Sequence, residues 1–252
     1  MKILVPTKRV PDTDQKIVAT ADGSSVATEH LPFVLNPFDA IALEEAVQIG
    51  ERDATGAVEV VAVGIGEPDY QQQLRTALAM GATRAICVEC HRSLDPWNVA
   101  RLLKAMVDRE QPDLVLMGKQ AVDDDANQTG QFLAALLDWP QATFASQLNF
   151  QDKQVRVNRE TDHGIETIEL PLPAIVTVDL RLNEPRYASM AGIMKAKKKP
   201  LDVIAAEDLG VPLEPRVEVL RYRSADTGRK CQRVATVEEL AQQLLKLTGR
   251  LG

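Results

Sequence analysis

The chain contains 252 residues, of which 45% are hydrophobic and 26% are charged. A chain of this length and composition can bury a substantial core, which excludes an intrinsically disordered protein. Its formal net charge of −7 and its aromatic content of 4% also argue against a polyanion-binding or base-stacking surface, so we expect no nucleic-acid partner.

The N-terminal residues MKILVPTKRV are typical of a strand and do not resemble the apolar region or cleavage site of a signal peptide. The sequence also lacks a run of eighteen apolar residues, the length that a membrane-spanning helix needs. We therefore expect a cytoplasmic protein without direct membrane insertion.

Short apolar runs alternate with amphipathic stretches over the first 140 residues, a pattern that predicts a mostly parallel sheet covered by helices. The first helix has strong start signals, because Asn36 suits the N-cap, Pro37 the first helical position and Asp39 the first turn. This order of elements favours a doubly wound, Rossmann-like α/β fold. We expect strands at residues 2–8, 58–65, 84–89 and 112–118, and helices at residues 36–52, 69–82 and 96–111.

The stretch from residue 116 to residue 140 carries the clearest sign of a ligand site. We expect a loop at residues 118–125 to follow a strand, and a helix to begin near Asn127. Ligands of doubly wound sheets bind beyond the carboxyl ends of the strands, where a helix N-terminus offers free N–H groups to a phosphate. The residues placed to hold such an anion are Asn127, Gln128, Thr129 and Gly130.

Three consecutive aspartates complicate this interpretation, because carboxylates repel a phosphate. Asp123, Asp124 and Asp125 would more naturally cap the helix or accept hydrogen bonds from ribose and adenine. An acidic cap on an ordinary helix explains the same residues, and the chain has no G-x-G-x-x-G or P-loop motif. The local pattern therefore leaves both interpretations open.

The pattern changes after residue 140. Residues 153–161 and 164–173 alternate apolar and polar side chains around a turn, which predicts an antiparallel hairpin, and residues 174–180 predict a buried strand. A segment rich in proline and glycine follows and predicts a C-terminal arm, which ends in an amphipathic helix at residues 236–247. We expect a nucleotide-binding domain at residues 1–182 and an arm with a terminal helix at residues 183–252.

The three cysteines give little sign of a metal or haem site. Cys87, Cys90 and His91 match the C-x-x-C-H pattern of covalent haem attachment, but the cysteines fall in a predicted core strand. Cys231 is far away in the sequence, and His30 and His163 show no paired spacing for zinc. We expect reduced thiols and no metal.

Two long stretches resemble the most characteristic segments of electron transfer flavoprotein β subunits. They are GKQAVDDDANQTGQFLAALLDWPQATFAS at residues 118–146 and VDLRLNEPRYASMAGIMKAKKKPLDVI at residues 178–204. The resemblance extends from VPTKRVPD near the N-terminus, through LNPFDAIALEEAV and RTALAMGA, to EELAQQLLK near the C-terminus.

This resemblance implies an electron carrier, not an enzyme with catalytic side chains of its own. The β subunit of the family forms a heterodimer with an α subunit, which holds most of the FAD, and it buries one AMP as a structural ligand. The carrier passes electrons from flavin dehydrogenases, such as acyl-CoA dehydrogenases, to a quinone reductase.

The resemblance also implies two sets of site residues. Those implied for the AMP site are Pro6, Asn36, Pro37, Phe38, Asp39, Ile65, Gly118, Lys119, Gln120, Ala121, Val122, Asp123, Asp124, Asp125, Ala126, Asn127, Gln128 and Thr129. Those implied for a loop that recognises dehydrogenases are Arg186, Tyr187, Met190, Ile193, Met194, Lys195, Lys197, Lys198 and Lys199.

Within the recognition segment, Met190 takes the place of an apolar anchor that would enter a pocket on the dehydrogenase. A flexible thioether suits several different pockets, and the lysines could steer acidic partners or pair with acidic groups of the complex itself. Many family members have leucine, proline and asparagine where this chain has Met190, Ala191 and Gly192, so we expect a more flexible loop here. Thr13 stands where many members place a tyrosine near the flavin.

Three other functions compete with this one. A flavin-bifurcating member of the family would hold a second FAD in place of AMP, but DDDANQTGQ resembles the non-bifurcating form more closely. An ATP-dependent enzyme on a related fold should have a glycine- and serine-rich loop after the first strand, and PTKRVPDTDQ contains neither residue. A regulatory nucleotide-binding module would not need the lysine-rich segment after LNEPRY.

Overall fold

The computed structural model describes residues 1–151, 153–224, 228 and 231–249. The chain divides into two compact units, one of residues 1–16 with 28–219 and the other of residues 17–27 with 220–252. None of the helices among the described residues is long and apolar enough to cross a membrane.

The first unit alternates strands and helices through most of its length. Its strands are β1 (Lys2–Thr7), β2 (Arg9–Pro11), β3 (Phe33–Leu35), β4 (Glu59–Gly66), β5 (Arg84–Glu89), β6 (Leu114–Gly118), β7 (Gln141–Gln151), β8 (Gln154–Thr161), β9 (Gly164–Pro171), β10 (Ala174–Val178) and β11 (Leu201–Ala205). Its helices are α1 (Pro37–Arg52), α2 (Gln71–Met80), α3 (Pro96–Glu110), α4 (Thr129–Leu137) and α5 (Met190–Ala196), with short 3-10 turns η1 (Pro68–Tyr70) and η2 (Ala206–Leu209).

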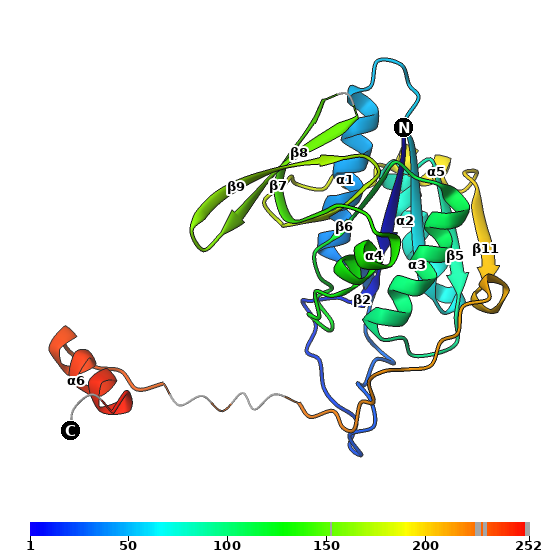
Figure 1. Ribbon diagram of the computed structural model, residues 1–252. Helices are drawn as coiled ribbons and strands as arrows, with labels where there is room; N and C mark the ends of the chain where they lie inside the picture. The colour runs from blue at the N-terminus through cyan, green and yellow to red at the C-terminus, as the bar shows by residue number, and fades with distance from the viewer. Residues whose placement is uncertain (152, 225–227, 229–230, 250–252) are drawn as a thin grey trace. The chain divides into compact units, whose positions relative to one another are not determined.

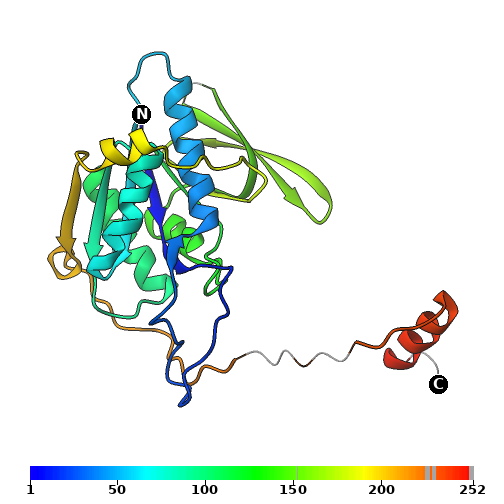
Figure 2. The same ribbon diagram turned by 180° about the vertical axis from the view of Figure 1, so that it is seen from behind.

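The main sheet has the strand order β11-β5-β4-β1-β6-β10-β7-β8-β9 (Figure 1). Strands β11 through β7 pair in parallel, and β7, β8 and β9 pair antiparallel at one edge. Helices α1 and α2 lie on one face of the parallel sheet and α3 and α4 on the other (Figures 1 and 2), and apolar side chains of each pair pack against their face. The predicted doubly wound α/β fold with an antiparallel hairpin is confirmed.

The strand order places a topological switch beside β1. The chain moves outward from β1 to β4 and β5, and then returns through α3 to form β6 on the other side of β1. In such sheets the loops after the central strands diverge to opposite faces and leave a crevice between them. The fold therefore predicts a ligand site at the carboxyl ends of β1, β4 and β6.

Two strands of the sheet were not predicted. β11 lies within the segment expected to form an arm, but it pairs in parallel with β5, from Leu201 opposite Ala85 to Ala205 opposite Glu89. β7 precedes the predicted hairpin and joins it to β10, with a register shift near Phe144, whose φ is 62°. β11 pairs with a strand more than 100 residues earlier in the sequence, whereas β7 pairs with the adjacent β8 as well as with β10.

The second unit contains the terminal helix α6 (Val237–Leu247), which begins where the sequence predicts. Thr236 accepts a hydrogen bond from the backbone N–H of Glu239 at 3.2 Å, as an N-cap should. No described residue of α6 is buried, and its exposed apolar side chains include Val237, Leu244 and Leu247. The same unit contains the hairpin-like residues 17–27, in which Ala19 bridges Val26.

Candidate functional site

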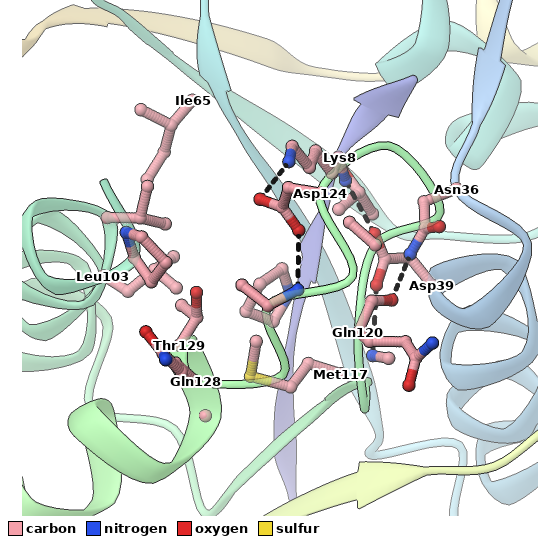
Figure 3. Close-up of a pocket in the computed structure, with 18 of the residues that line it drawn as sticks. Lys8, Asn36, Asp39, Ile65, Leu103, Met117, Gln120, Asp124, Gln128 and Thr129 are labelled. Carbon is pink, nitrogen blue, oxygen red and sulfur yellow. Dashed lines mark hydrogen bonds and ion pairs between the residues drawn. The ribbon is translucent and has the colours of Figure 1, made fainter. Parts of the chain in front are cut away.

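A cavity of about 240 Å³ lies at the switch point, beyond the carboxyl ends of β1, β4 and β6 (Figure 3). Its wall includes Pro6 at the end of β1, Gly66 at the end of β4 and Gly118 at the end of β6. The N-terminal end of α4 forms another part of the wall. The location matches the crevice in which doubly wound sheets bind ligands.

Asn36 holds the loop that follows β6. Its side-chain amide donates to the carbonyl oxygen of Gln120 at 2.9 Å, and its Oδ1 accepts from the N–H of Val122 at 3.2 Å. Asn36 occupies the predicted N-cap position of α1, but its side chain makes no capping bond to that helix. The side chain stabilises the cavity loop instead, because the loop carbonyl and N–H lie within its reach.

Asp39 is a buried carboxyl on the floor of the cavity. It accepts hydrogen bonds from the backbone N–H of Lys8 at 2.8 Å and of Gly118 at 3.1 Å, and so joins the ends of β1 and β6. Burial raises its pKa to about 7, although hydrogen bonds from Asn36, Lys8 and Gly118 act in the opposite direction. The burial effect is the larger one, so this carboxyl titrates near neutral pH.

The aspartate run pairs with a lysine that the sequence analysis did not single out. Lys8 Nζ lies 2.8 Å from Asp123 Oδ1 and 2.9 Å from Asp124 Oδ2, and Figure 3 shows the pair with Asp124. Burial alone would lower the pKa of Lys8, but its hydrogen bonds and charge interactions with these aspartates raise it. The lysine neutralises part of the charge that would otherwise repel an anion in the cavity.

The aspartates do not cap α4, as the sequence had suggested they could. Asp125 accepts a hydrogen bond from the Gln120 side chain, and Asp124 accepts one from the N–H of Ala126 at 3.1 Å. The helix starts only at Thr129, four residues beyond the last aspartate, so the carboxylates stabilise the loop before it.

The first turn of α4 faces the cavity without a side-chain cap. Gln128 occupies the N-cap position but makes no side-chain capping bond within the described structure. A Cβ atom on Gly130 would lie 2.6 Å from Thr177 Cγ2, so glycine is required for the close approach of α4 to β10. The N–H groups of this turn, with the positive end of the helix dipole, suit a phosphate.

The opposite wall is apolar. Ile65 lies near the end of β4 and Leu103 lies in α3 (Figure 3), and Leu94 and Val99 come from the loop before α3 and from α3. A cavity with one apolar wall and a row of N–H donors suits a flat aromatic base joined to a phosphate.

Most of the residues predicted for the nucleotide site meet at this cavity. Those that line it are Pro6, Asn36, Asp39, Ile65, Gly118, Lys119, Gln120, Ala121, Asp124, Ala126, Asn127, Gln128 and Thr129. Pro37, Phe38, Val122, Asp123 and Asp125 do not line it. The lining residues absent from the prediction are Thr7, Lys8, Val63, Gly66, Arg92, Leu94, Pro96, Val99, Leu103 and Met117, with Gly130 expected only on the anion argument. Thr7, Lys8, Val63 and Met117 lie near the carboxyl ends of predicted strands and Gly66 directly follows one, a signal that could have identified them.

The segment predicted to recognise dehydrogenases contains helix α5, although its sequence predicts a flexible loop. Ser189 accepts a hydrogen bond from the N–H of Gly192 at 3.0 Å and so caps the helix. Tyr187 is 98% exposed and Met190 is 77% exposed, and both Ile193 and Met194 are also exposed. The helix thus presents an apolar surface to solvent.

Two residues of this segment have contacts that set them apart from the other candidates. Arg186 forms ion pairs with Glu44 and Glu51 of α1. Lys199 donates to main-chain carbonyl oxygens at the end of α2, while Lys195, Lys197 and Lys198 are exposed. The ammonium group of Lys199 is therefore held by carbonyl oxygens of this chain, and a role of Lys199 in steering partners stays a prediction.

The C-x-x-C-H residues belong to the core and its edge. Cys87 and Cys90 are buried, and burial raises the pKa of Cys87 to about 11. His91 Nδ1 lies 2.5 Å from Glu67 Oε2 at the surface, and this carboxylate raises the pKa of the imidazole. A buried neutral thiol is a poor haem-attachment or metal ligand.

Comparison with known proteins identifies the family. The model of the electron transfer flavoprotein domain matches residues 24–209. The chain is 48% identical to the electron transfer flavoprotein subunit beta of Bradyrhizobium diazoefficiens over 252 residues, covering 100% of this chain and 99% of that protein. It is also 48% identical to the protein of the same name from Mus musculus and 46% identical to that from Homo sapiens, each over 255 residues, covering 100% of this chain and 99% of each relative. The chain therefore belongs to the family of electron transfer flavoprotein β subunits.

Proposed function

We propose that this chain is the β subunit of a heterodimeric carrier that takes electrons from flavin dehydrogenases and delivers them to a quinone reductase. The family assignment supports electron transfer and an α-subunit partner. The exposed apolar side chains of α5 support the docking of a second protein. Such a carrier needs no general acid, base or nucleophile from this chain, since its redox chemistry belongs to a cofactor.

The cavity at the ends of β1, β4 and β6 is proposed to hold AMP as a structural ligand. The observation that carries this proposal is the uncapped first turn of α4 opposite an apolar wall. The phosphate oxygens would accept hydrogen bonds from the backbone N–H groups around Thr129 and Gly130, while the base would lie against Ile65 and Leu103. Lys8, already bound to Asp123 and Asp124, would lower the negative potential near the phosphate.

A second FAD in this cavity is the competing proposal within the family. The preference for AMP comes from the sequence, because DDDANQTGQ at residues 123–131 resembles the non-bifurcating form of the family more closely.

The FAD of the carrier is proposed to be held mainly by the α subunit, and when bound it supplies the redox chemistry of electron transfer. This chain would contribute orientation and docking. Thr13 is exposed and does not supply the aromatic ring that many relatives place near the flavin.

Met190 is proposed as the apolar anchor for dehydrogenases. It is 77% exposed in this chain, and an anchor of this kind becomes buried only in the complex. Removing such an anchor typically costs roughly 2 kcal/mol, or about a thirtyfold loss of affinity. Its flexible thioether suits partners with differently shaped pockets.

The experiment is steady-state electron transfer from a cognate dehydrogenase, through the heterodimer, to an artificial dye. Met190→Ala should raise the concentration of carrier needed for half-maximal rate by about thirtyfold, while Met190→Leu should be tolerated. Ile165→Ala is the matched control, because Ile165 is also exposed, at 73%, but lies on β9. The flavin content and melting temperature should not change. Unaltered kinetics in Met190→Ala would refute the docking role.

A further inference from the structure

The segment that carries Met190 is bound to α1 at its N-terminal end. The Arg186 guanidinium forms a fork to two carboxylates, with Nε 2.7 Å from Glu44 Oε2 and Nη1 2.6 Å from Glu51 Oε1. Its second terminal nitrogen lies 2.9 Å from both Glu44 Oε1 and Glu51 Oε2, and its backbone N–H also donates to Glu44. Glu44 is only 3% exposed, so this end of the segment is held by a bidentate pair in which one carboxylate is buried and the guanidinium is partly exposed.

The C-terminal end of the segment is bound to α2 by a reciprocal pair of cations. Arg75 of α2 donates to the carbonyl oxygens of Ala196 at 2.8 Å and Lys199 at 2.9 Å. In return, Lys199 Nζ donates to the carbonyl oxygens of Leu78 at 3.0 Å and Ala82 at 2.6 Å. Each cation satisfies carbonyl groups at the end of the other helix, where the helix itself supplies no donor.

The middle of α5 packs directly on α2. A Cβ atom on Gly192 would lie 2.6 Å from the carbonyl oxygen of Ala79, so the two backbones approach as closely as glycine allows. Ala196, one turn further on, is only 2% exposed. Gly192 therefore serves as a contact point between helices and does not loosen the segment as its sequence had suggested. Figure 2 shows α5, in yellow, beside the end of α2.

A helix of seven residues has little stability of its own in water. Its conformation must therefore come from the contacts at its two ends and its middle. These contacts leave Met190 and Met194 exposed on the opposite side, at 77% and 59%.

We propose that α5 is a preformed docking helix, and that Arg75, Arg186 and Lys199 are positioning residues that fix its pose before a partner arrives. This inference rests on the proposed docking function of Met190. The segment would then lose its conformational entropy when the carrier folds, so that binding of a partner would not carry this cost. Of the four clustered lysines, Lys199 thus acts within the carrier, whereas Lys195, Lys197 and Lys198 remain available to partners.

The test uses the full-length chain in its heterodimer with the α subunit and measures two quantities. The first is backbone hydrogen exchange of residues 190–196, and the second is the concentration of carrier that gives half-maximal rate with a cognate dehydrogenase. The variants are Lys199→Met and Arg75→Met, which remove the charge but keep most of the side-chain volume. Lys198→Met is the matched control, since Lys198 is an exposed neighbour in the same run.

We expect Lys199→Met and Arg75→Met to speed exchange of residues 190–196 by about tenfold and to raise the half-maximal concentration by about threefold to tenfold, with the maximal rate unchanged. Lys198→Met should leave exchange unaltered. Gly192→Ala should act like Lys199→Met and Arg75→Met, because the added methyl group would push α5 away from α2. It serves as the independent variant if Lys199→Met or Arg75→Met fails to fold.

Unchanged exchange in these variants would overturn the inference, because the helix would then be ordered without the contacts of Arg75 and Lys199. Faster exchange with an unaltered half-maximal concentration would also overturn it, provided that Met190→Ala impairs docking. If Met190→Ala itself has no effect on the kinetics, the proposed docking function is wrong. The exchange result still decides whether Arg75 and Lys199 hold α5 in place.

Discussion

Asn36 binds Gln120 across 84 positions of sequence, with the side-chain amide of Asn36 2.9 Å from the Gln120 carbonyl oxygen. The same side chain accepts a hydrogen bond from Val122, so a single buried amide fixes two points of the loop that forms one wall of the cavity. The shape of the proposed nucleotide site therefore depends on Asn36, whose side-chain amide forms hydrogen bonds to the cavity loop.

Asn36→Asp tests this relationship with almost no change in volume. The substitution keeps an acceptor for Val122 but places a carboxylate oxygen against the Gln120 carbonyl. We expect a loss of stability of about 1–3 kcal/mol and a loss of bound nucleotide, because a buried carbonyl loses its donor. Thermal unfolding and nucleotide content measure the two effects. The control is Asn149→Asp on the exposed side of β7, and equal behaviour of the two variants would contradict the prediction.

Gly118→Ala should be severely damaging, although it adds only one methyl group. The added Cβ would collide with Asp39 Oδ1 and lie 2.7 Å from Phe38 Cβ, so β6 could not stay next to the start of α1. We expect lower melting temperature and loss of nucleotide. Gly50→Ala is the control, since its Cβ would lie 3.7 Å from Val58, and inside α1 alanine should add about 1 kcal/mol of stability. A Gly118→Ala protein that melts like the parent would disprove the close contact.

Asp39 should make the stability of the protein depend on pH. Its pKa is about 7 in the folded chain, compared with 3.8 for an unperturbed aspartate, so the folded state binds the proton more tightly. The stabilising contribution is fully present below pH 3.8 and is lost as the pH rises to about 7. The slope for one group is at most about 1.4 kcal/mol per pH unit.

Comparison with Asp39→Asn isolates this contribution from those of the other carboxyl groups. Between about pH 5 and pH 7 the melting temperature of the parent should fall relative to that of the variant, which has no titrating group at this position. Parallel melting curves over this range would show that Asp39 is already ionised in the folded protein.

The exposed lysines of the docking segment should act on encounter more than on stability. Replacing Lys195, Lys197 and Lys198 together by glutamine should reduce the rate of reduction by an acidic dehydrogenase at low salt, with the difference vanishing at high salt. Lys199→Gln should lack this salt dependence, because its ammonium group is bound to Leu78 and Ala82. Stopped-flow measurements across ionic strengths would distinguish the two behaviours, and a salt-independent triple variant would contradict steering.

Local signals in the sequence predicted the loop after β6 and the start of α4, because Gly118 ends a buried strand and ligands of doubly wound sheets bind beyond such strand ends. The prediction of Pro6, Asn36, Asp39 and Ile65 came from the resemblance to electron transfer flavoprotein β subunits. The part of the apolar wall that α3 supplies was missed because Val99 and Leu103 belong to an ordinary amphipathic pattern in that helix. Their orientation toward the cavity depends on the packing of α3 beneath the strands.

The docking segment was harder to predict, because its structure comes from distant partners. By local rules, Gly192 and the lysine run indicate a flexible loop. The helix is instead held by hydrogen bonds of Arg75 and Lys199 to groups that lie at least 117 residues away in the sequence. The ion pair of Lys8 with Asp123 and Asp124 was missed for the same reason. A charged residue shows its partner only after the fold brings the two together.

The nucleotide content of the purified heterodimer tests the account most directly. Heat-released small molecules, separated by chromatography and quantified against protein, should contain one AMP and one FAD per heterodimer, and Asn36→Asp should lose AMP while keeping FAD. Two FAD per heterodimer with no AMP, or no adenine nucleotide besides a single FAD, would contradict the proposal that the cavity between β1, β4 and β6 holds AMP.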